Sequence, residues 1–280
     1  MSTENLPRVA EGTADSAPAA LLDVRGVQKT YTTSQREVEA VRDLTFHIDE
    51  GGFVCMVGPS GAGKTTILKC IAGLLAPTSG SIRLAGEEYS DSPAGMAVVF
   101  QEYGRSLYPW LTVSANVELP LKAKKLPRAE REHLVRQALE VVGLGDFGDV
   151  HPWQLSGGMQ QRVAIARAIA YQPKILLMDE PFAAVDAQTR ADLEDLMRRL
   201  WSQLGITVLF ITHDIDEAVY LGQRVIVLSK APSVILESVD VDLPRPRNQI
   251  DTRKEPKFIE LRTKLHGLIQ HANSQESSTR

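Results

Sequence analysis

The sequence is poor in cysteine and in long apolar runs. Its two cysteines, Cys55 and Cys70, are too few for a disulfide framework or a zinc site. No stretch approaches the roughly 18–20 uninterrupted apolar residues that a membrane helix needs. Residues 1–20 include acidic residues and have no apolar block after a basic one, which disfavours a secretory signal. Together these absences favour a soluble protein of the cytosol.

A surplus of positive charge is also missing. The 280 residues carry 31 Lys and Arg against 35 Asp and Glu, a net charge of −4. Proteins built to hold nucleic acid normally show a basic surplus, so the composition argues against nucleic acid as a partner. Residues 243–280 differ from the rest, with eight Lys and Arg against four Asp and Glu. A basic amphipathic tail could contact lipid head groups, but we favour a helix that packs on its own domain.

The chain divides into an extension, a folded domain and a tail. Residues 1–20 are predicted to be disordered, because they hold few large apolar side chains to bury. Residues 21–242 alternate strand and helix patterns, which predicts an α/β fold with a mostly parallel sheet. Within this domain, residues 103–165 show helical periodicity and little strand signal, which predicts a helical subdomain inserted in the core. Residues 243–280 are predicted to form a basic C-terminal tail with a short helix.

Short continuous apolar runs predict strands that are buried on both faces. They lie at residues 53–57, 175–178, 207–211 and 225–228. Helical periodicity covers residues 130–142, 189–203 and 258–269. No internal repeat is present, so the chain carries the motifs of one nucleotide site.

A glycine-rich loop follows the first apolar run. It matches the pattern G-x-x-x-x-G-K-[ST], and its residues are Gly58, Pro59, Ser60, Gly61, Ala62, Gly63, Lys64 and Thr65. Glycines let backbone amides turn toward phosphate oxygens, and the following helix, which includes Thr66, adds the positive end of its dipole. Lys64 is expected to reach the β- and γ-phosphates, and the Thr65 hydroxyl to bind Mg²⁺. The loop predicts a nucleotide site without separating ATP from GTP.

Two carboxylates, Asp179 and Glu180, end the apolar run that begins at Ile175. Ligands gather at the carboxyl ends of strands in an open α/β sheet. Asp179 therefore fits a magnesium-linked role, and Glu180 fits a general base that deprotonates the attacking water. The alternative is a helix N-cap followed by a solvated acid, which we disfavour because the phosphate loop lies upstream.

The stretch Leu155-Ser156-Gly157-Gly158-Met159-Gln160-Gln161-Arg162 resembles the signature motif of the ATP-binding cassette (ABC) ATPases. The order of motifs also resembles that family: phosphate loop, glutamine loop, signature, acidic pair and histidine. The resemblance covers nearly the whole chain from about Leu21. It implies a P-loop NTPase fold with a mostly parallel core sheet, an N-terminal antiparallel β-subdomain and a helical subdomain.

The resemblance implies roles for further residues that match the family's motifs. Tyr31 resembles the aromatic residue that stacks on adenine, although an ordinary strand aromatic remains an alternative. Gln101 resembles the glutamine that senses Mg²⁺ and the attacking water. His213 resembles the histidine that contacts the γ-phosphate, and Asp186 lies in the segment that resembles the loop crossing between two subunits.

The resemblance also implies an assembly in which ATP joins two copies head to tail. Ser156, Gly157 and Gly158 precede a helical run, so their amides and hydroxyl are expected to hold the γ-phosphate of the partner's ATP. Two positions depart from the common pattern. Met159 replaces a glutamine, for which we expect little loss of function, and Ala183-Ala184-Val185-Asp186 lacks the usual serine.

Because no spanning helix is present, the resemblance implies a separate membrane permease, with this chain at the cytoplasmic face of the membrane. The predicted docking surface lies within residues 102–120, where Leu107, Tyr108, Pro109, Trp110 and Leu111 form an apolar cluster. Internal packing is the alternative for some of these residues. Residues 108–121, 186–190 and 213–218 resemble importers of the nitrate, sulfonate and taurine group, which implies an external substrate-binding protein as an indirect partner.

Two other functions compete with an importer ATPase. A soluble ABC ATPase acting on ribosomes or DNA usually carries two cassettes or a long coiled-coil insert, and neither is present here. A catalytically silent binding module is disfavoured because Lys64, Asp179, Glu180 and His213 are all intact.

Overall fold

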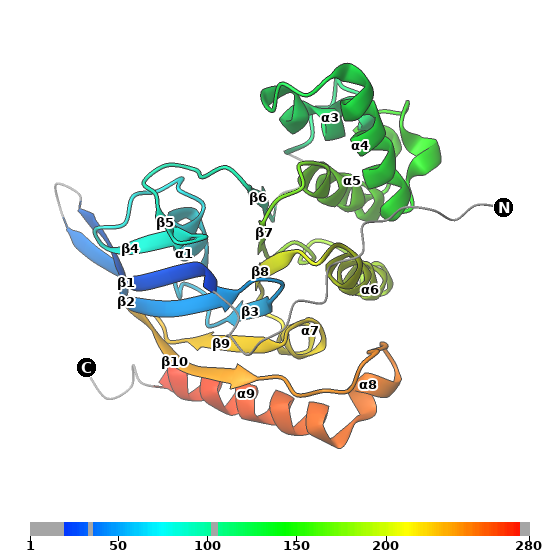
Figure 1. Ribbon diagram of the computed structural model, residues 1–280. Coiled ribbons are helices and arrows are strands. Elements are labelled where there is room, and N and C mark those ends of the chain that lie inside the picture. Colours follow the sequence, from blue (N-terminus) through cyan, green and yellow to red (C-terminus); the bar gives the residue numbers. More distant parts are fainter. Residues whose placement is uncertain (1–19, 33–35, 102–105, 275–280) are drawn as a thin grey trace, which may run out of the picture.

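The computed structural model describes residues 20–32, 36–101 and 106–274, and within them ten strands form one sheet (Figure 1). Nearly all of the predicted N-terminal extension, residues 1–20, lies outside the described residues. The strand order is β5-β4-β1-β2-β10-β9-β3-β8-β7-β6. The strands are β1 (Ala20–Thr32), β2 (Glu37–Asp49), β3 (Phe53–Val57), β4 (Ser79–Leu84), β5 (Glu87–Glu88), β6 (Met96–Val99), β7 (Ile175–Asp179), β8 (Thr207–Ile211), β9 (Arg224–Leu228) and β10 (Ser233–Asp240).

The sheet has a parallel half and an antiparallel half. Strands β9, β3, β8, β7 and β6 pair in parallel. Strands β1, β2, β4 and β5 pair antiparallel. Strand β10 joins the halves, because it runs parallel to β2 and antiparallel to β9. The predicted α/β fold with a mostly parallel core and an N-terminal antiparallel part is confirmed.

Strand β3 shows how the apolar core is divided into two layers. Its side chains alternate between the two faces of the sheet. Phe53 and Cys55 join one buried cluster, while Val54 and Met56 join the other. Both faces are therefore covered, which explains why this strand reads as an unbroken apolar run.

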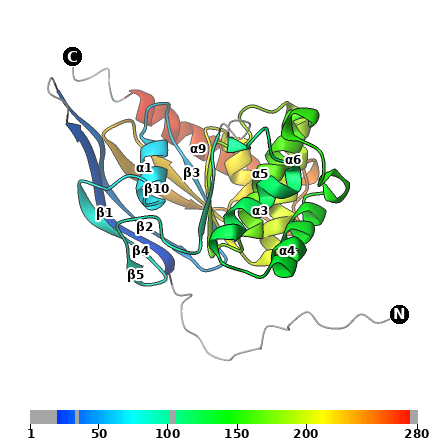
Figure 2. The same cartoon turned by 90° about the horizontal axis from the view of Figure 1, so that it is seen from above.

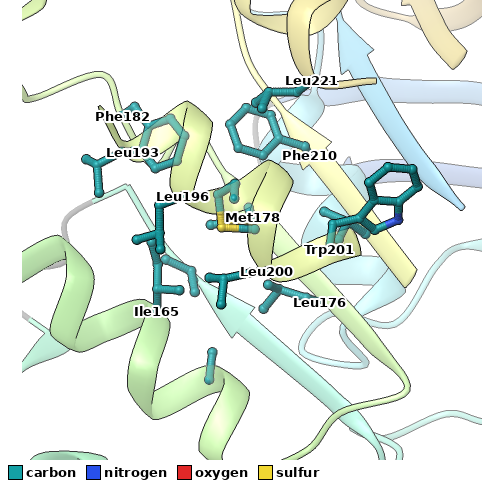
Figure 3. Packing of buried hydrophobic residues seen from close by; sticks show 14 of the residues in the cluster. Ile165, Leu176, Met178, Phe182, Leu193, Leu196, Leu200, Trp201, Phe210 and Leu221 are labelled. Carbon is teal, nitrogen blue, oxygen red and sulfur yellow. The ribbon is translucent and has the colours of Figure 1, made fainter. Parts of the chain in front are cut away.

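Helices cover the two faces of the parallel strands. Helix α1 (Lys64–Ile71) packs Ile67 and Leu68 on one face, in the cluster shared with β1 and β2. Helices α5 (Gly157–Ala170), α6 (Ala187–Leu204) and α7 (Ile215–Leu221) line the other face. Figure 3 shows this second layer, where Leu196 and Leu200 of α6 meet Met178 of β7.

A group of helices lies to one side of the sheet (Figure 2). It consists of α3 (Val113–Ala123), α4 (Arg128–Val141) and α5, which pack on one another. Two 3-10 turns, Gly145–Phe147 and Pro152–Gln154, connect α4 to α5. The buried Asn116 of α3 secures the preceding loop, because its Oδ1 accepts a hydrogen bond from the Tyr108 amide at 2.8 Å and its Nδ2 donates to the Leu111 carbonyl at 3.2 Å.

The C-terminal segment folds back on the domain. It contains α8 (Asp251–Lys254) and α9 (Pro256–Ser274), and α9 packs against α7 and β9. Its Phe258, Leu261 and Leu265 are buried in the main apolar cluster. No helix in the described part of the chain is both long enough and apolar enough to cross a bilayer.

Candidate active site

The phosphate loop connects the carboxyl end of β3 to the first residue of α1. Gly61 and Gly63 adopt left-handed backbone angles, with φ of +79° and +72°. A Cβ atom on Gly63 would also lie 3.1 Å from the Ala40 carbonyl oxygen. Both positions therefore favour glycine for reasons of conformation. No side chain caps the N-terminus of α1 and its first turn holds no acidic residue, so its amides remain available to an anion.

Lys64 folds back over the loop. Its Nζ donates hydrogen bonds to the carbonyl oxygens of Gly58 at 2.9 Å and Pro59 at 3.1 Å. The same Nζ lies 3.8 Å from Oε1 of Glu180. Burial lowers the pKa of Lys64, while the two carboxylates after β7 oppose that shift. Phosphate oxygens carry negative charge that carbonyl oxygens lack, so this ammonium group can exchange its carbonyl partners for them.

Asp179 is the last residue of β7 and is almost fully buried. Burial raises the pKa of this carboxyl, and a hydrogen bond from the Thr65 side chain acts in the opposite direction. Asp179 is not a helix N-cap, because the next helix, α6, starts only at Ala187. A hydroxyl and a carboxylate side by side are oxygen ligands of the kind that Mg²⁺ takes when phosphates complete its shell.

Glu180 follows in a strained backbone conformation, with a φ of +44°. Its amide donates to the Ile211 carbonyl at 2.8 Å, which fixes the turn against the end of β8. Its Oε2 lies 3.0 Å from Nδ1 of His213, and its Oε1 faces Lys64. The carboxylate is thus held between a cation and an imidazole at the edge of the sheet where the phosphate loop begins.

Tyr31 and Thr66 lie beside the loop, on β1 and α1. The Tyr31 hydroxyl and Thr66 Oγ1 are 3.2 Å apart, and the Tyr31 side chain is exposed. An exposed ring face next to the phosphate loop is available for stacking. Gln101 is exposed just after β6, whose carboxyl end lies beside that of β7.

The signature residues and Asp186 form a second group, at the N-termini of α5 and α6. Ser156 caps α5, with Oγ accepting from the Met159 amide at 3.3 Å. Asp186 caps α6, accepting from the Thr189 amide at 3.0 Å and from its hydroxyl at 2.7 Å. Those hydrogen bonds lower the pKa of Asp186. Gly158 packs on Thr189, where an added Cβ would lie 2.4 Å from Cγ2.

The two groups are separate within one chain. Figures 1 and 2 both place α5 with the helical group and α1 on the far side of the parallel strands. The hydrogen bonds of Ser156 and Asp186 stay within their own helix N-termini. The structure therefore brings together the phosphate loop, acidic pair and His213, and it does not bring the signature to them.

Sequence reasoning missed three residues that surround Glu180 and His213. Arg190, Asp214 and Glu217 line the same small pocket, and Arg190 lies 3.6 Å from Asp214. Burial raises the pKa of Glu217 to about 8. The available signal was its position one turn after His213 on the inward face of an amphipathic helix.

Known proteins resemble this chain over most of its length. Residues 41–183 match the family model of the ABC transporter. The nitrate import ATP-binding protein NrtD of Synechocystis sp. is 41% identical over 91% of this chain and 97% of the relative. An uncharacterized ABC transporter ATP-binding protein of Methanocaldococcus jannaschii is 45% identical over 89% of this chain and 91% of the relative.

The fold also matches a solved structure. An ATP-binding cassette in a dimeric post-hydrolysis state, bound to ADP and Pi, superimposes with a TM-score of 0.70 at 35% identity. The match covers 79% of this chain and 98% of the solved chain.

Proposed function

This chain belongs to the ABC transporter family, and we propose that it is the ATP-hydrolysing subunit of an importer of a small anion, of the nitrate, sulfonate or taurine type. It is an ATPase, as the family match and the resemblance to an ADP-bound and Pi-bound cassette support. The single observation that carries the catalytic part is the placement of Glu180 between Lys64 and His213, directly after the buried Asp179.

The geometry supports a mechanism of in-line hydrolysis. Lys64 exchanges its loop carbonyls for the β- and γ-phosphate oxygens, and the loop amides bind the rest of the phosphate chain. Glu180 accepts a proton from the attacking water, whose oxygen forms a bond to the γ-phosphorus as the bond to ADP breaks. His213 orients Glu180 through the 3.0 Å contact. Gln101 lies at the same edge of the sheet, where it is positioned to hold the water.

Thr65 and Asp179 are the residues that fit Mg²⁺, because their oxygens lie in hydrogen-bond contact beside the loop. We propose Gln101 as a third ligand from its place after β6. When bound, the ion neutralises charge on the β- and γ-phosphates. Tyr31 is proposed to stack on the adenine ring from its exposed position next to Thr66.

The signature group acts in a second copy of the chain. Ser156 and Gly157 are exposed at the N-terminus of α5, and Gly158 is buried beside them. This helix N-terminus suits a γ-phosphate, yet it is separate from the phosphate loop of its own chain. A head-to-tail dimer resolves this, with Asp186 next to the junction. The solved cassette that this chain resembles is a dimer.

The permease is proposed to dock on the loop before α3. Tyr108 and Trp110 are exposed with ring centroids 5.2 Å apart, while Leu107 is buried and belongs to internal packing. The buried Asn116 side chain fixes this loop through hydrogen bonds to the Tyr108 amide and the Leu111 carbonyl. Residues 102–105 of the predicted surface lie outside the described residues. The anion class is supported by the relative named for nitrate import, and it implies an external binding protein that selects the substrate.

Affinity capture tests the importer. We expect the tagged chain to retain a multi-spanning membrane protein from detergent-solubilised membranes. Replacing Tyr108 and Trp110 by alanine should abolish that capture and leave ATPase activity intact, whereas the matched exposed change Phe147→Ala should not affect it. Capture of ribosomes or DNA, with no membrane protein, would overturn the importer in favour of a soluble ABC ATPase.

A further inference from the structure

A pocket rich in arginine lies between the C-terminal half of α6 and residues 245–247. Its volume is about 600 Å³, which is larger than an inorganic ion needs. The guanidinium groups that line it belong to Arg198, Arg199, Arg245 and Arg247. Within the described residues, Asp195 is the one acidic residue of the lining. Four positive groups against one negative group is unusual in a chain whose net charge is −4.

Asp195 is already engaged by its neighbours. Its Oδ1 accepts hydrogen bonds from the Tyr220 hydroxyl at 2.5 Å and from Gln249 Nε2 at 3.1 Å. None of the four arginines forms an ion pair with a carboxylate in the described ranges. The positive charge of the pocket is therefore left largely uncompensated by the protein.

Two of the arginines serve the fold. Arg198 donates to the carbonyls of Tyr220 and Leu221, and Arg247 donates to those of Tyr220 and Gly222. These carbonyls end α7, so the two cations stabilise its negative end. Even so, Nε of the buried Arg247 has no hydrogen-bond partner within the described structure. Burial lowers the pKa of Arg247 to about 10, and Arg198 and Arg245 act in the same direction.

The other two arginines, within the described residues, donate no hydrogen bond to the carbonyls that end α7. Arg199 and Arg245 are exposed at the mouth of the pocket. The guanidinium of Arg245 lies 4.9 Å from the centroid of the Trp201 ring. Figure 3 shows this ring at one end of the drawn cluster. A planar guanidinium that rests on an aromatic face keeps its N–H fork free for an oxyanion.

The pocket is distinct from the nucleotide site. Trp201 Nε1 donates to the Gly51 carbonyl, just before the amino end of β3, whereas the phosphate loop starts at its carboxyl end. Five residues of strand separate the two ends by roughly 15 Å. A ligand in the arginine pocket would therefore not compete directly with nucleotide.

We propose that the arginine pocket binds a soluble small molecule that carries a phosphate group. Its oxygens accept hydrogen bonds from Arg199 and Arg245 at the mouth, and Arg198 and Arg247 supply positive charge beneath. The volume beyond the phosphate accommodates the organic part of the ligand.

Fluorescence of Trp201 provides the measurement. The parent protein carries Trp110→Phe and Trp153→Phe, which leaves Trp201 as the one tryptophan of the chain. It also carries Lys64→Ala, which weakens phosphate binding at the loop. Titration with inorganic pyrophosphate should give a saturable change, because the bound anion neutralises the Arg245 cation that lies over the Trp201 ring. Potassium chloride at matched ionic strength should give none.

Two further variants locate the binding. Arg199→Gln with Arg245→Gln should raise the Kd for pyrophosphate at least about tenfold. The matched loss of two exposed charges, Lys254→Gln with Lys257→Gln, should leave it unchanged. If the first variant does not fold, Arg199→Lys with Arg245→Lys is used instead. Its Kd for pyrophosphate should lie between those of the parent and the glutamine variant. An unsaturable titration of the parent, or equal curves for parent and pocket variant, would overturn the proposal.

Discussion

At the scale of single residues, the geometry of the candidate site depends on two neighbouring carboxylates. Asp179 is the last residue of β7, and Glu180 follows it. Asp179 points into the protein and is buried beside Thr65, whereas Glu180 turns outward to His213. Successive side chains of a strand point to opposite sides, so the two carboxylates diverge where β7 ends, and the φ of +44° at Glu180 turns the backbone away from the strand. The two neighbouring carboxylates therefore suit the two roles proposed for them, metal binding for Asp179 and proton acceptance for Glu180.

The first prediction concerns Glu180→Gln. The amide keeps the size of the side chain but cannot accept a proton from water, so we expect kcat to fall at least about 100-fold. ATP affinity should change little, because Lys64 and the loop amides remain. Phosphate release and the Kd of a fluorescent ATP analogue measure the two effects. Glu140→Gln, an exposed change on α4, is the control, and wild-type turnover in Glu180→Gln would exclude the residue as base.

The second prediction concerns the pH dependence of stability at Glu217. Its pKa is about 8 in the fold against an ordinary 4.5, mainly because of burial, with Glu194 and Asp214 adding to the shift and Thr212 and Arg190 opposing it. An acid with a raised folded pKa contributes stability that is present below its unfolded pKa. That contribution is lost as the pH rises through the folded pKa.

Glu217→Gln should therefore gain stability over the wild type as the pH rises from about 4.5 to 8, and the gain should level off above that. Each unit of pKa difference corresponds to about 1.4 kcal/mol, so the total is on the order of a few kcal/mol. Urea unfolding at stepped pH measures the difference, with Glu140→Gln as the exposed control. A difference that stays flat with pH would show that Glu217 ionises normally.

At the scale of elements, the N-termini of α5 and α6 are built as one unit. Ser156 caps the first helix and Asp186 caps the second, and Gly158 packs on Thr189 between them. The signature amides thus owe their position to the neighbouring helix as well as to their own. This contact leads to the third prediction.

Gly158→Ala should lower ATPase activity and destabilise the fold by about 1–3 kcal/mol, because its Cβ would overlap Thr189 Cγ2. The amide of residue 158 is unchanged, so the loss arises from displacement of the helix. Adding Thr189→Ser removes that methyl group and keeps the hydroxyl bonded to Asp186. The double variant should recover both activity and melting temperature, and a double variant as impaired as the single one would contradict the packing argument.

The sequence predicts best those elements whose residues are all buried to the same degree. Strands β3 and β8 coincide with their predicted runs because every residue in them is buried. Strand β10 was missed because only two of its eight residues are buried, so it shows no continuous apolar run. Its partners β2 and β9 are set by the tertiary fold. Helix α9 extends beyond the predicted 258–269, and the residues added at its ends are mostly polar, with Ala272 the one that is buried.

The motifs of the candidate site were visible in sequence, but its contacts were not. Motif order placed Glu180 and His213 near one another, yet their 3.0 Å contact depends on β7 and β8 lying side by side. The arginine pocket had no sequence signal at all. Residues 198–199 and 245–247 line one pocket because the tail packs back across α6 and α7. Such a contact between distant segments leaves no local pattern in the sequence.

At the scale of the whole molecule, the tail is part of the folded domain. Phe258 is fully buried, and Arg253 pairs with the buried Glu194 at 2.8 Å. Part of the positive charge of the tail therefore serves α6 and α7. The signature lies apart from the phosphate loop of the same chain, and under the proposed head-to-tail arrangement a second copy supplies it.

The fourth prediction tests whether two chains complete each other's sites. Lys64→Ala disables the phosphate loop, and Ser156→Arg places a bulky cation at the exposed signature, so each variant alone should be inactive. In a head-to-tail heterodimer of the two, one site combines both defects and the other has an intact loop and an intact signature. Mixing them in equal amounts should restore about a quarter of wild-type activity, because half of the dimers are mixed and each carries one intact site of two.

Size-exclusion chromatography with ATP checks that dimers form, and the double variant Lys64→Ala/Ser156→Arg mixed with wild type is the control for subunit exchange. If mixing the single variants restores no activity although dimers form, each chain hydrolyses ATP with its own residues and the head-to-tail arrangement is wrong.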